Sequence, residues 1–353
     1  MAVKKIGVAI SGGVDSGTVL YLLKEQGYRL TAFYTEYFSC KNQAQTQKAC
    51  CSSKSLRRAR ETAKYLNVPF YKLDFREEFE NKVIKPFIRY YNNGLTPNPC
   101  VICNEKLRFL TLLKKVEAMG MDYLATGHYA RIDEGRLSRA KDSTKDQSYF
   151  LYGVPIKSLS KVKFPLGNIS KKKVRKIAKR AKLPVKEATE SQDCCILKGN
   201  NLPDFLKDHL KMQRGNIVDK KGNILGVHPG FQNFTIGQRR GFGGLGKKYY
   251  VIKINPETNQ IVVGNEDKLF KKSVKFKMKD SGLLKKLNVP GNYEIKLRST
   301  HSAAKCRVTA LDRKNGIVTI VFRKKQRAPT PGQSAVLYQN NYVLGGGEIL
   351  KEN

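Results

Sequence analysis

The first 130 or so residues alternate between short apolar runs and longer segments with helical periodicity, and this alternation is the strongest constraint on the fold. We predict strands over 4–10, 28–35, 69–75 and 122–126, and helices over 55–66, 76–91, 104–119 and from Val14 up to a C-cap at Gly27. Strands that alternate with helices form a parallel, doubly wound sheet, which binds its ligand at the carboxyl ends of the strands. We therefore expect an α/β domain.

The second half of the chain has a different pattern. A very basic helix is predicted over 171–183, and beyond about residue 200 short apolar runs are separated by Gly, Pro, Asn and Asp. The predicted strands are 249–254, 260–264, 293–300, 305–312, 316–322 and 334–338. We therefore divide the chain into an α/β domain over 1–200, a central β-rich domain over 201–267 and a C-terminal β-rich domain over 268–353.

The turn between the first strand and the first helix has the features of a phosphate site. Ser11, Gly12 and Gly13 form the turn, and Asp15 and Ser16 lie in the first helical turn. Glycine lets a backbone approach a ligand closely, and the N–H groups at a helix start attract anions. The Gly-x4-Gly-Lys-Ser/Thr spacing of the common P-loop is absent here. We predict a phosphate-bearing ligand, with a plain glycine turn as the alternative.

The net charge favours a polyanionic partner. The chain has 67 Lys and Arg against 29 Asp and Glu, a formal net charge of +38. Cationic side chains bind nucleic acids by neutralising phosphates, although a lysine-rich proteome would also raise the charge. No apolar run approaches the roughly 20 residues of a membrane span, and the first predicted strand begins too early for a signal peptide. We therefore expect a cytoplasmic protein with no membrane partner.

The cysteines form two clusters that could carry chemistry. A cytoplasmic location favours metal binding or thiol reactions over structural disulfides. Cys100 and Cys103 follow a stiff Thr-Pro-Asn-Pro segment, and Cys194 and Cys195 are a vicinal pair. Cys103 is predicted near a helix start, where the helix dipole lowers the pKa of a thiol. Three chemistries fit: a structural zinc site, an iron–sulfur cluster on Cys100, Cys103 and Cys195, or a Cys103–Cys195 pair that transfers sulfur through a persulfide.

The remaining cysteines and most histidines receive simpler interpretations. Cys306 alternates with apolar neighbours in a predicted strand, so we expect it in the core. Three histidines have no ligand spacing and are predicted as surface or packing residues: His209, His228 and His301. Three cysteines in a polar loop are assigned no role: Cys40, Cys50 and Cys51.

Seven motifs along the chain carry a resemblance to a known enzyme family. They are Ser-Gly-Gly-Val-Asp-Ser at 11–16, Thr-Pro-Asn-Pro-x3-Cys-Asn at 96–104, Ala-Thr-Gly-His-Tyr-Ala-Arg at 125–131, Lys-Asp-Gln-Ser-Tyr-Phe-Leu at 145–151, Ser-Gln-Asp-x-Cys at 191–195, Phe-Thr-Ile-Gly-Gln-Arg-Arg-Gly at 234–241 and Pro-Gly-Gln-Ser-Ala-Val at 331–336. In these motifs and their order, the chain resembles the tRNA-specific 2-thiouridylases over nearly its whole length. The resemblance implies a PP-loop ATP-pyrophosphatase domain, a small central β domain and a C-terminal β-barrel.

The resemblance also implies an activity and its partners. ATP, with Mg²⁺, would adenylate the 2-carbonyl oxygen of the wobble uridine in tRNAs for Lys, Glu and Gln, and sulfur would then displace AMP. Adenylation is chemically reasonable because a carbonyl oxygen is a poor leaving group, and its adenylated form leaves readily as AMP. The implied partners are tRNA and a protein that donates persulfide sulfur, with no DNA. The alternatives are another PP-loop enzyme, either a different tRNA thiolase or an amide-forming ligase, and a non-catalytic RNA-binding protein.

The resemblance assigns roles by position. It implies that ATP contacts Ala9, Ile10, Ser11, Gly12, Gly13, Val14, Asp15 and Ser16, with Tyr34 and Gly127 lining its base and ribose. It implies that Cys195 carries the persulfide, that Cys103 is its partner thiol, and that the target base is bordered by Asn98, Pro99 and Cys100. It implies tRNA contacts at His128, Lys145, Asp146, Gln147, Arg298, Ser299 and Gln333.

One position departs from the commonest family pattern. Many members have Asp where this chain has Cys100, and that Asp is a candidate acid/base. With Cys100 at this position, the chain lacks the Asp that would transfer the proton there. A third thiol strengthens the interpretation as a 4Fe–4S cluster on Cys100, Cys103 and Cys195. The persulfide and cluster mechanisms both stay open on the sequence.

Overall fold

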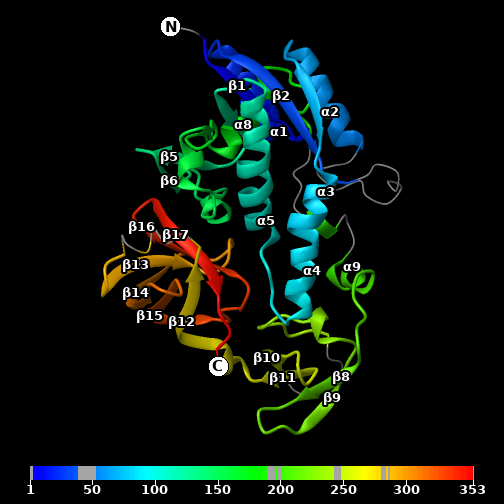
Figure 1. The fold of residues 1–353 in the computed structure, drawn as a ribbon, viewed down its shortest axis with the longest axis vertical. Helices are drawn as coiled ribbons and strands as arrows, with labels where there is room; N and C mark the ends of the chain where they lie inside the picture. The colour runs from blue at the N-terminus through cyan, green and yellow to red at the C-terminus, as the bar shows by residue number, and fades with distance from the viewer. Residues whose placement is uncertain are drawn as a thin grey trace. The chain divides into compact units, whose positions relative to one another are not determined.

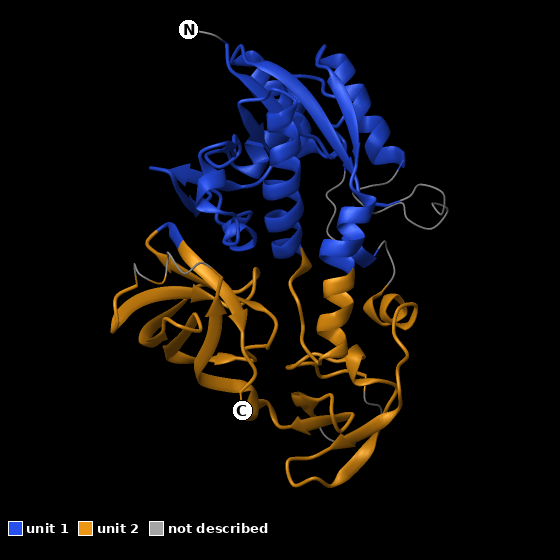
Figure 2. Cartoon of the chain, in the orientation of Figure 1, with its two compact units in different colours: residues 1–84, 100–199, 341–343 blue, residues 85–99, 200–340, 344–353 orange. Residues whose placement is uncertain are grey.

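The computed structural model describes residues 3–38, 53–188, 195–197, 201–241, 248–279, 284 and 287–352. The chain forms two compact units, each of which is discontinuous in sequence (Figure 2). Unit 1 contains residues 1–84, 100–199 and 341–343, and unit 2 contains residues 85–99, 200–340 and 344–353. Residues 85–99 thus pack with the β-rich part of the chain, although they lie within the predicted α/β domain. The three-domain division stays a prediction.

Unit 1 is built on a five-stranded parallel sheet (Figure 1). Its strand order is β3-β2-β1-β4-β7, with bounds Phe70–Asp74, Arg29–Glu36, Lys5–Ala9, Tyr123–Ala125 and Val162–Lys163. Gly7 in β1 lies opposite Thr31 in β2 and Leu124 in β4. The chain order reverses between β1 and β4, and open α/β sheets bind ligands at such a switch point. The predicted doubly wound class is confirmed.

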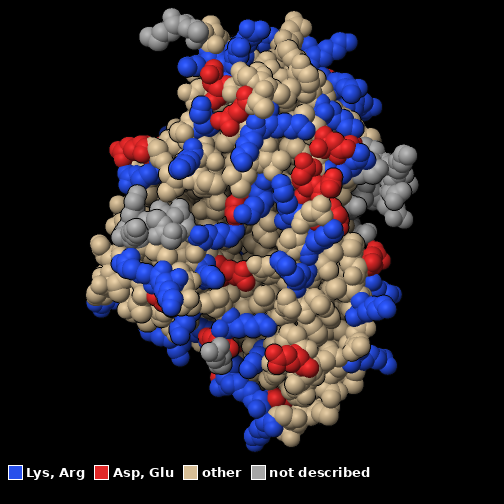
Figure 3. Space-filling model, viewed as in Figure 1, with Lys and Arg blue, Asp and Glu red and all other residues tan. Residues whose placement is uncertain are grey.

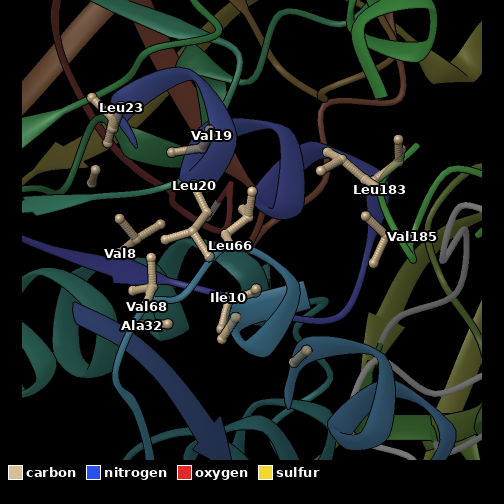
Figure 4. Close-up of a cluster of buried hydrophobic side chains, with 14 of the residues drawn as sticks. Val8, Ile10, Val19, Leu20, Leu23, Ala32, Leu66, Val68, Leu183 and Val185 are labelled. Carbon is tan, nitrogen blue, oxygen red and sulfur yellow. The ribbon is translucent and has the colours of Figure 1, made fainter. Parts of the chain in front are cut away.

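Helices bury the faces of this sheet. Helix α1 (Val14–Glu25) begins directly after the predicted turn and places Val19 and Leu20 against Val8 and Ala32 of the sheet (Figure 4). These four side chains have no exposed surface, because both faces of a parallel sheet must be covered. Unit 1 also contains α2 (Ser53–Tyr65), β5 (Ala130–Asp133), β6 (Arg136–Arg139), η4 (Ser148–Leu151), α7 (Ile156–Leu159), α8 (Lys171–Arg180) and η5 (Cys195–Leu197).

The two predicted helices of residues 76–119 both contain π-helical turns. The first comprises α3 (Arg76–Phe79), η2 (Glu80–Ile84) and α4 (Lys85–Asn92), and the second comprises α5 (Pro99–Ile102), η3 (Cys103–Leu112) and α6 (Leu113–Ala118). The predicted start at Asn104 was wrong, since the second helix begins at Pro99. Proline suits a first helical turn, where its missing N–H costs no hydrogen bond.

Unit 2 contains two β structures, as predicted from its short apolar runs separated by Gly, Pro, Asn and Asp. The smaller is a sheet of order β10-β11-β8-β9, with bounds Tyr250–Asn255, Gln260–Gly264, Gly215–Val218 and Ile224–His228. The larger is a closed barrel of order β12-β15-β14-β13-β16-β17, with bounds Phe270–Met278, Ile317–Arg327, Ala304–Asp312, Gly291–Lys296, Ser334–Gln339 and Tyr342–Ile349. Pairing of β12 with β17 closes it. Helical turns α9 (Leu202–Lys207), η6 (Phe231–Asn233) and η7 (Glu266–Leu269) complete the unit.

The barrel has its own apolar core, which includes the predicted core cysteine. Phe276, Ile295 and Phe322 are at most 1% exposed inside it. Cys306 is 4% exposed, and burial raises the pKa of its thiol to about 12, so it is inert at neutral pH. No helix in the described parts of the chain is long and apolar enough to cross a membrane.

Candidate functional site

The turn between β1 and α1 leaves the first N–H groups of the helix without a side-chain cap. Gly13 occupies the N-cap position in extended conformation and supplies no capping side chain. The Ser16 hydroxyl accepts a hydrogen bond from Ser11 N at 3.0 Å and donates to Gly13 O at 3.2 Å. These two bonds stabilise the conformation of the turn. Uncapped N–H groups at a helix start form a site for a phosphate.

Two glycines bring neighbouring chain segments close to this turn. Gly12 has a φ of +74°, and a Cβ atom there would lie 2.1 Å from the carbonyl oxygen of Ser55. Gly127 follows β4, and a Cβ atom there would lie 3.1 Å from the backbone nitrogen of Ser16. The ends of β1 and β4 therefore meet at the start of α1, which places Gly127 beside the phosphate turn at the switch point of the sheet.

Asp15 is paired with a buried lysine that the sequence analysis did not single out. Lys171, the first residue of α8, is 8% exposed, and its Nζ lies 2.7 Å from both carboxylate oxygens of Asp15. The Tyr129 hydroxyl also donates to Asp15 at 2.7 Å. One sequence signal could have identified Lys171, because it continues the buried face of α8 formed by Val174 and Ala178. A buried ammonium beside uncapped N–H groups adds to the attraction for a phosphate.

The other residues expected to contact ATP lie in or beside the core. Tyr34, on β2, is 2% exposed, and its hydroxyl lies 2.9 Å from the Ser55 hydroxyl. Ile10 and Val14 are at most 3% exposed, so their side chains pack in the core and leave only backbone for a ligand. The structure thus brings the 9–16 segment and Gly127 to one edge of the sheet. It places Tyr34 on the adjacent strand.

A chain of hydrogen bonds joins η3 to the end of β4. The Arg108 guanidinium donates to Asn104 Oδ1 at 3.2 Å and lies 3.3 Å from His128 Nε2. Because a guanidinium can only donate, Nε2 is the acceptor and the ring proton sits on Nδ1, 2.8 Å from Thr126 Oγ1. Asn104 Nδ2 donates in turn to the carbonyl oxygen of Phe150 at 3.3 Å. His128 is therefore held neutral and oriented.

We expect His128 to remain neutral at and somewhat below pH 6.5, the ordinary pKa of histidine. Burial, and then the Arg108 charge, hold its pKa well below the ordinary value of 6.5. Since the folded-state pKa is lowered, this group stabilises the fold above pH 6.5, and that stabilisation is lost as the pH falls. Ring-proton NMR shifts measured against pH check this, with Arg108→Met expected to raise the midpoint. A wild-type midpoint near 6.5 would contradict the assignment.

The described cysteines differ in position and exposure. Cys103 is 8% exposed and is the first residue of η3, whereas Cys100 is exposed in the first turn of the helix and Cys195 is partly exposed in η5. Cys100 thus takes the position near the helix start that the sequence predicted for Cys103. Four cysteines lie outside the described residues: Cys40, Cys50, Cys51 and Cys194.

The described residues do not form a metal site. No three His, Cys, Asp or Glu side chains within the described ranges are placed to hold a metal ion. Cys100, Cys103 and Cys195 are among those residues, so neither the zinc site nor the three-thiol cluster is assembled here.

The residues of unit 1 expected to contact tRNA also hold their own loop together. Asp146 accepts hydrogen bonds from Ala140 N at 2.9 Å and from the Ser148 hydroxyl at 2.9 Å. The side chain of Gln147 accepts from Tyr129 N at 2.9 Å, which ties this loop to the residue that contacts Asp15. Lys145 is partly exposed. Asp146 and Gln147 therefore have a structural role that any contact with RNA must accommodate.

Three further expected tRNA contacts lie in the barrel of unit 2. Arg298 donates to Thr330 Oγ1 at 2.9 Å and to the carbonyl oxygen of Ala328 at 3.2 Å, and Ser299 beside it is partly exposed. Gln333 donates to the carbonyl oxygens of Thr96 and Pro97. His228, assigned only a packing role, is 1% exposed with its ring against Phe234.

Unit 2 also contains a basic cavity of about 1060 Å³ between its two β structures. One acidic residue, Glu352, lines it together with six lysines: Lys220, Lys253, Lys268, Lys271, Lys275 and Lys351. Lys and Arg side chains are also spread over the face of the molecule shown in Figure 3, where the acidic side chains form smaller groups. This excess of positive charge suits a polyanion more than a small neutral substrate.

The fold and the phosphate turn define a class: an α/β domain with a helix-start turn suited to a phosphate, followed by two β structures. Family models agree with this architecture over nearly the whole chain. Residues 4–199 match the tRNA methyl transferase HUP domain, residues 203–265 the tRNA methyl transferase PRC-barrel domain, and residues 271–349 the Aminomethyltransferase beta-barrel domain.

Full-length relatives narrow the class. The chain is 42% identical to the tRNA-specific 2-thiouridylase MnmA of Clostridium perfringens, and the match covers 99% of each chain. It is 41% identical to the protein of the same name from Caldicellulosiruptor saccharolyticus, again over 99% of each chain, and 40% identical to that of Clostridioides difficile, over 99% of this chain and 98% of the relative. The chain belongs to the tRNA-specific 2-thiouridylase family.

Proposed function

We propose that this protein is a cytoplasmic, ATP-dependent tRNA sulfurtransferase that replaces the 2-carbonyl oxygen of the wobble uridine with sulfur in tRNAs for Lys, Glu and Gln. The observation that carries the proposal is the uncapped turn of Ser11–Ser16 at the switch point of the sheet, with Lys171 buried beside it. Family membership over the full chain supports the substrate class. The basic cavity of unit 2 and the net charge of +38 support a polyanionic partner.

The phosphate turn would hold the triphosphate of ATP. The N–H groups at the start of α1 bind phosphate oxygens, and Lys171 neutralises charge that develops as pyrophosphate leaves. Asp15, which also accepts a hydrogen bond from the Tyr129 hydroxyl, holds the Lys171 ammonium in place. Mg²⁺ would enter with the phosphates, since Mg²⁺ is usually held by substrate oxygens and water with few protein ligands. AMP is thereby transferred to the uridine oxygen, which becomes a good leaving group.

Sulfur transfer would use two thiols. The terminal sulfur of a persulfide on Cys195 attacks C2 of the adenylated uridine, and AMP leaves with the former carbonyl oxygen. The Cys103 thiolate then attacks Sγ of Cys195, breaks the S–S bond and leaves the sulfur on the base as a thiocarbonyl. A Cys103–Cys195 disulfide results, so a cellular thiol reductant must reduce it and a protein persulfide donor must reload Cys195. The exposure of Cys195 suits reloading.

The test is nucleoside mass spectrometry after incubation of metal-free protein with ATP, Mg²⁺, a persulfide and unmodified glutamate tRNA. We expect 2-thiouridine to form without iron, and we expect Cys103→Ser and Cys195→Ser each to abolish it. Cys306→Ser is the matched control, because this thiol is buried in the barrel core and should be dispensable. A parallel sample is reconstituted anaerobically with iron.

Each of the other possible results supports a different mechanism or function. Product that appears only after iron reconstitution supports the cluster on Cys100, Cys103 and Cys195 and overturns the persulfide steps. Release of AMP without tRNA indicates an amide-forming ligase, and thiolation at another base indicates a different tRNA thiolase. RNA binding that is insensitive to Asp15→Ala, without product in either sample, indicates a non-catalytic RNA-binding protein.

A further inference from the structure

A turn of the C-terminal barrel is hydrogen-bonded to the segment that leads into the helix of Cys100 and Cys103. The turn is Pro331–Gln333 and the segment is Leu95–Pro97, both within unit 2. Thr96 N donates to the carbonyl oxygen of Pro331 at 3.0 Å. Gln333 Nε2 donates to the carbonyl oxygens of Thr96 at 3.0 Å and of Pro97 at 3.1 Å. Three hydrogen bonds thus tie the two segments together.

Close backbone contact at Gly332 accompanies these bonds. Gly332 has a φ of +88°, and a Cβ atom there would lie 2.9 Å from Thr96 N and 3.0 Å from Thr96 O. No other residue type fits this position without displacing the segment. Thr96 also contacts the segment that follows η6, since its hydroxyl donates to the Thr235 hydroxyl at 3.3 Å. The segment is therefore fixed from two sides.

The backbone of Gln333 is itself held in a fixed position. Gln333 N donates to the carbonyl oxygen of Thr330 at 3.1 Å, and Gln333 O accepts from Ile349 N at 2.9 Å. A glutamine amide has two N–H donors, and here two carbonyl oxygens receive them. Pro97 has no N–H of its own, so its carbonyl is one of few polar groups by which this stretch can be anchored. The geometry favours a structural use of this side chain over a contact with RNA.

We propose that Gln333 is a positioning residue, whose amide fixes Thr96 and Pro97 and thereby sets where the helix of Cys100 and Cys103 begins. Cys100 follows Pro97 by three residues, through Asn98 and the helix-starting Pro99. With so short a connection, movement of Pro97 is transmitted to both thiols. The inference rests on the proposed function for its meaning in catalysis, but the anchoring itself can be tested without activity.

The test compares Gln333→Met, which keeps the bulk and removes both donors, with Gln326→Met on strand β15 of the same barrel. Gln326 is the matched control because its amide donates to backbone oxygens of its own strand, at Lys324 and Lys325. Three quantities are measured: the single-turnover thiolation rate at saturating tRNA, the Kd for tRNA, and the rate of iodoacetamide modification of Cys103 without tRNA or ATP.

We expect Gln333→Met to slow the single-turnover rate by about ten- to a hundredfold, as small misplacements of reacting groups do, with Kd changed by less than about twofold. Modification of Cys103, which is buried in the intact protein, should become several-fold faster. Gln326→Met should change none of the three. Gln333→Asn, which keeps the amide but shortens its reach, should behave like Gln333→Met and serves if the latter fails to fold.

Two results would overturn the inference. A weaker Kd with an unchanged rate at saturating tRNA and unchanged Cys103 modification would make Gln333 an RNA contact. No change in any quantity would make the anchoring dispensable. If the wild-type protein thiolates no tRNA, the proposed function fails, and the cysteine modification still decides whether Gln333 fixes the segment.

Discussion

Replacement of Lys171 by Met should reduce the rate of tRNA-dependent pyrophosphate release by about a hundredfold or more, as loss of a charge that stabilises the transition state does. The ammonium lies 2.7 Å from both oxygens of Asp15, beside the uncapped start of α1. Its loss removes positive charge from the phosphate site and leaves a mostly buried carboxylate that still accepts a hydrogen bond from the Tyr129 hydroxyl. We expect the free energy of unfolding to fall by about 1–3 kcal/mol.

The neighbouring residue provides a control for this prediction. Lys172 is exposed on the same helix, so Lys172→Met should leave rate and stability unchanged. Asp15→Asn added to Lys171→Met removes the unpaired charge, and it should restore stability without restoring the rate. Pyrophosphate release and urea unfolding measure the two effects separately. A Lys171→Met protein that keeps its rate would show that this lysine takes no part in phosphate binding.

Gly12→Ala should disrupt the phosphate turn itself. A Cβ atom would lie 2.1 Å from the carbonyl oxygen of Ser55, and the φ of +74° is strained for alanine. The backbone strain alone costs about 1–3 kcal/mol, and relief of the clash requires the turn to move away from α2. We expect ATP affinity to fall by about tenfold or more, because the N–H groups that bind phosphate move with the turn.

Substitutions at two other glycines distinguish the effect of backbone strain from that of the steric clash. Gly27 has a similar φ of +78° but open space around its Cβ position, so Gly27→Ala reports backbone strain without a clash. Gly13 has a φ of −95°, and its Cβ would lie at an ordinary 3.5 Å from Ser11 Oγ. Calorimetric ATP titration of the three variants should show the large loss for Gly12→Ala alone. Equal losses at Gly12 and Gly13 would contradict the steric argument.

The elements that could be predicted from the sequence are those whose signal is local. Strand β1 and helix α1 appear as an apolar run followed by helical spacing, with the glycine turn between them. Strand β12 was missed because lysines fill its exposed positions and alternation begins only at Val274. Strand β17 was missed because it contains three glycines. Gly347 permits the barrel to close, since a Cβ atom there would lie 1.9 Å from Lys277 O.

The same distinction holds for the candidate site: residues in a contiguous motif could be predicted from the sequence, and residues brought together by the fold could not. The phosphate turn is a contiguous motif, so its residue types alone indicated an anion site. Lys171 is 156 residues from Asp15 in the chain, and only the folded sheet brings them together. The sequence predicts Cys103 too close to the helix start, because proline suits both the approach to a helix and its first turn. In the structure Pro99 is the first residue of the helix. The assigned roles of Cys103, Cys195 and the tRNA contacts stay predictions.

The interleaving of the two units has a consequence for protein synthesis. Residues 85–99 leave the ribosome early, but their partners in unit 2 come much later. Phe87, for example, packs against Phe205, and Gln333 follows Thr96 by 237 residues. At about 5–20 residues per second, that interval is roughly 10–50 s, during which the α4 segment lacks its final neighbours. A nascent chain stalled before residue 200 should therefore carry this segment in a form that proteases can reach.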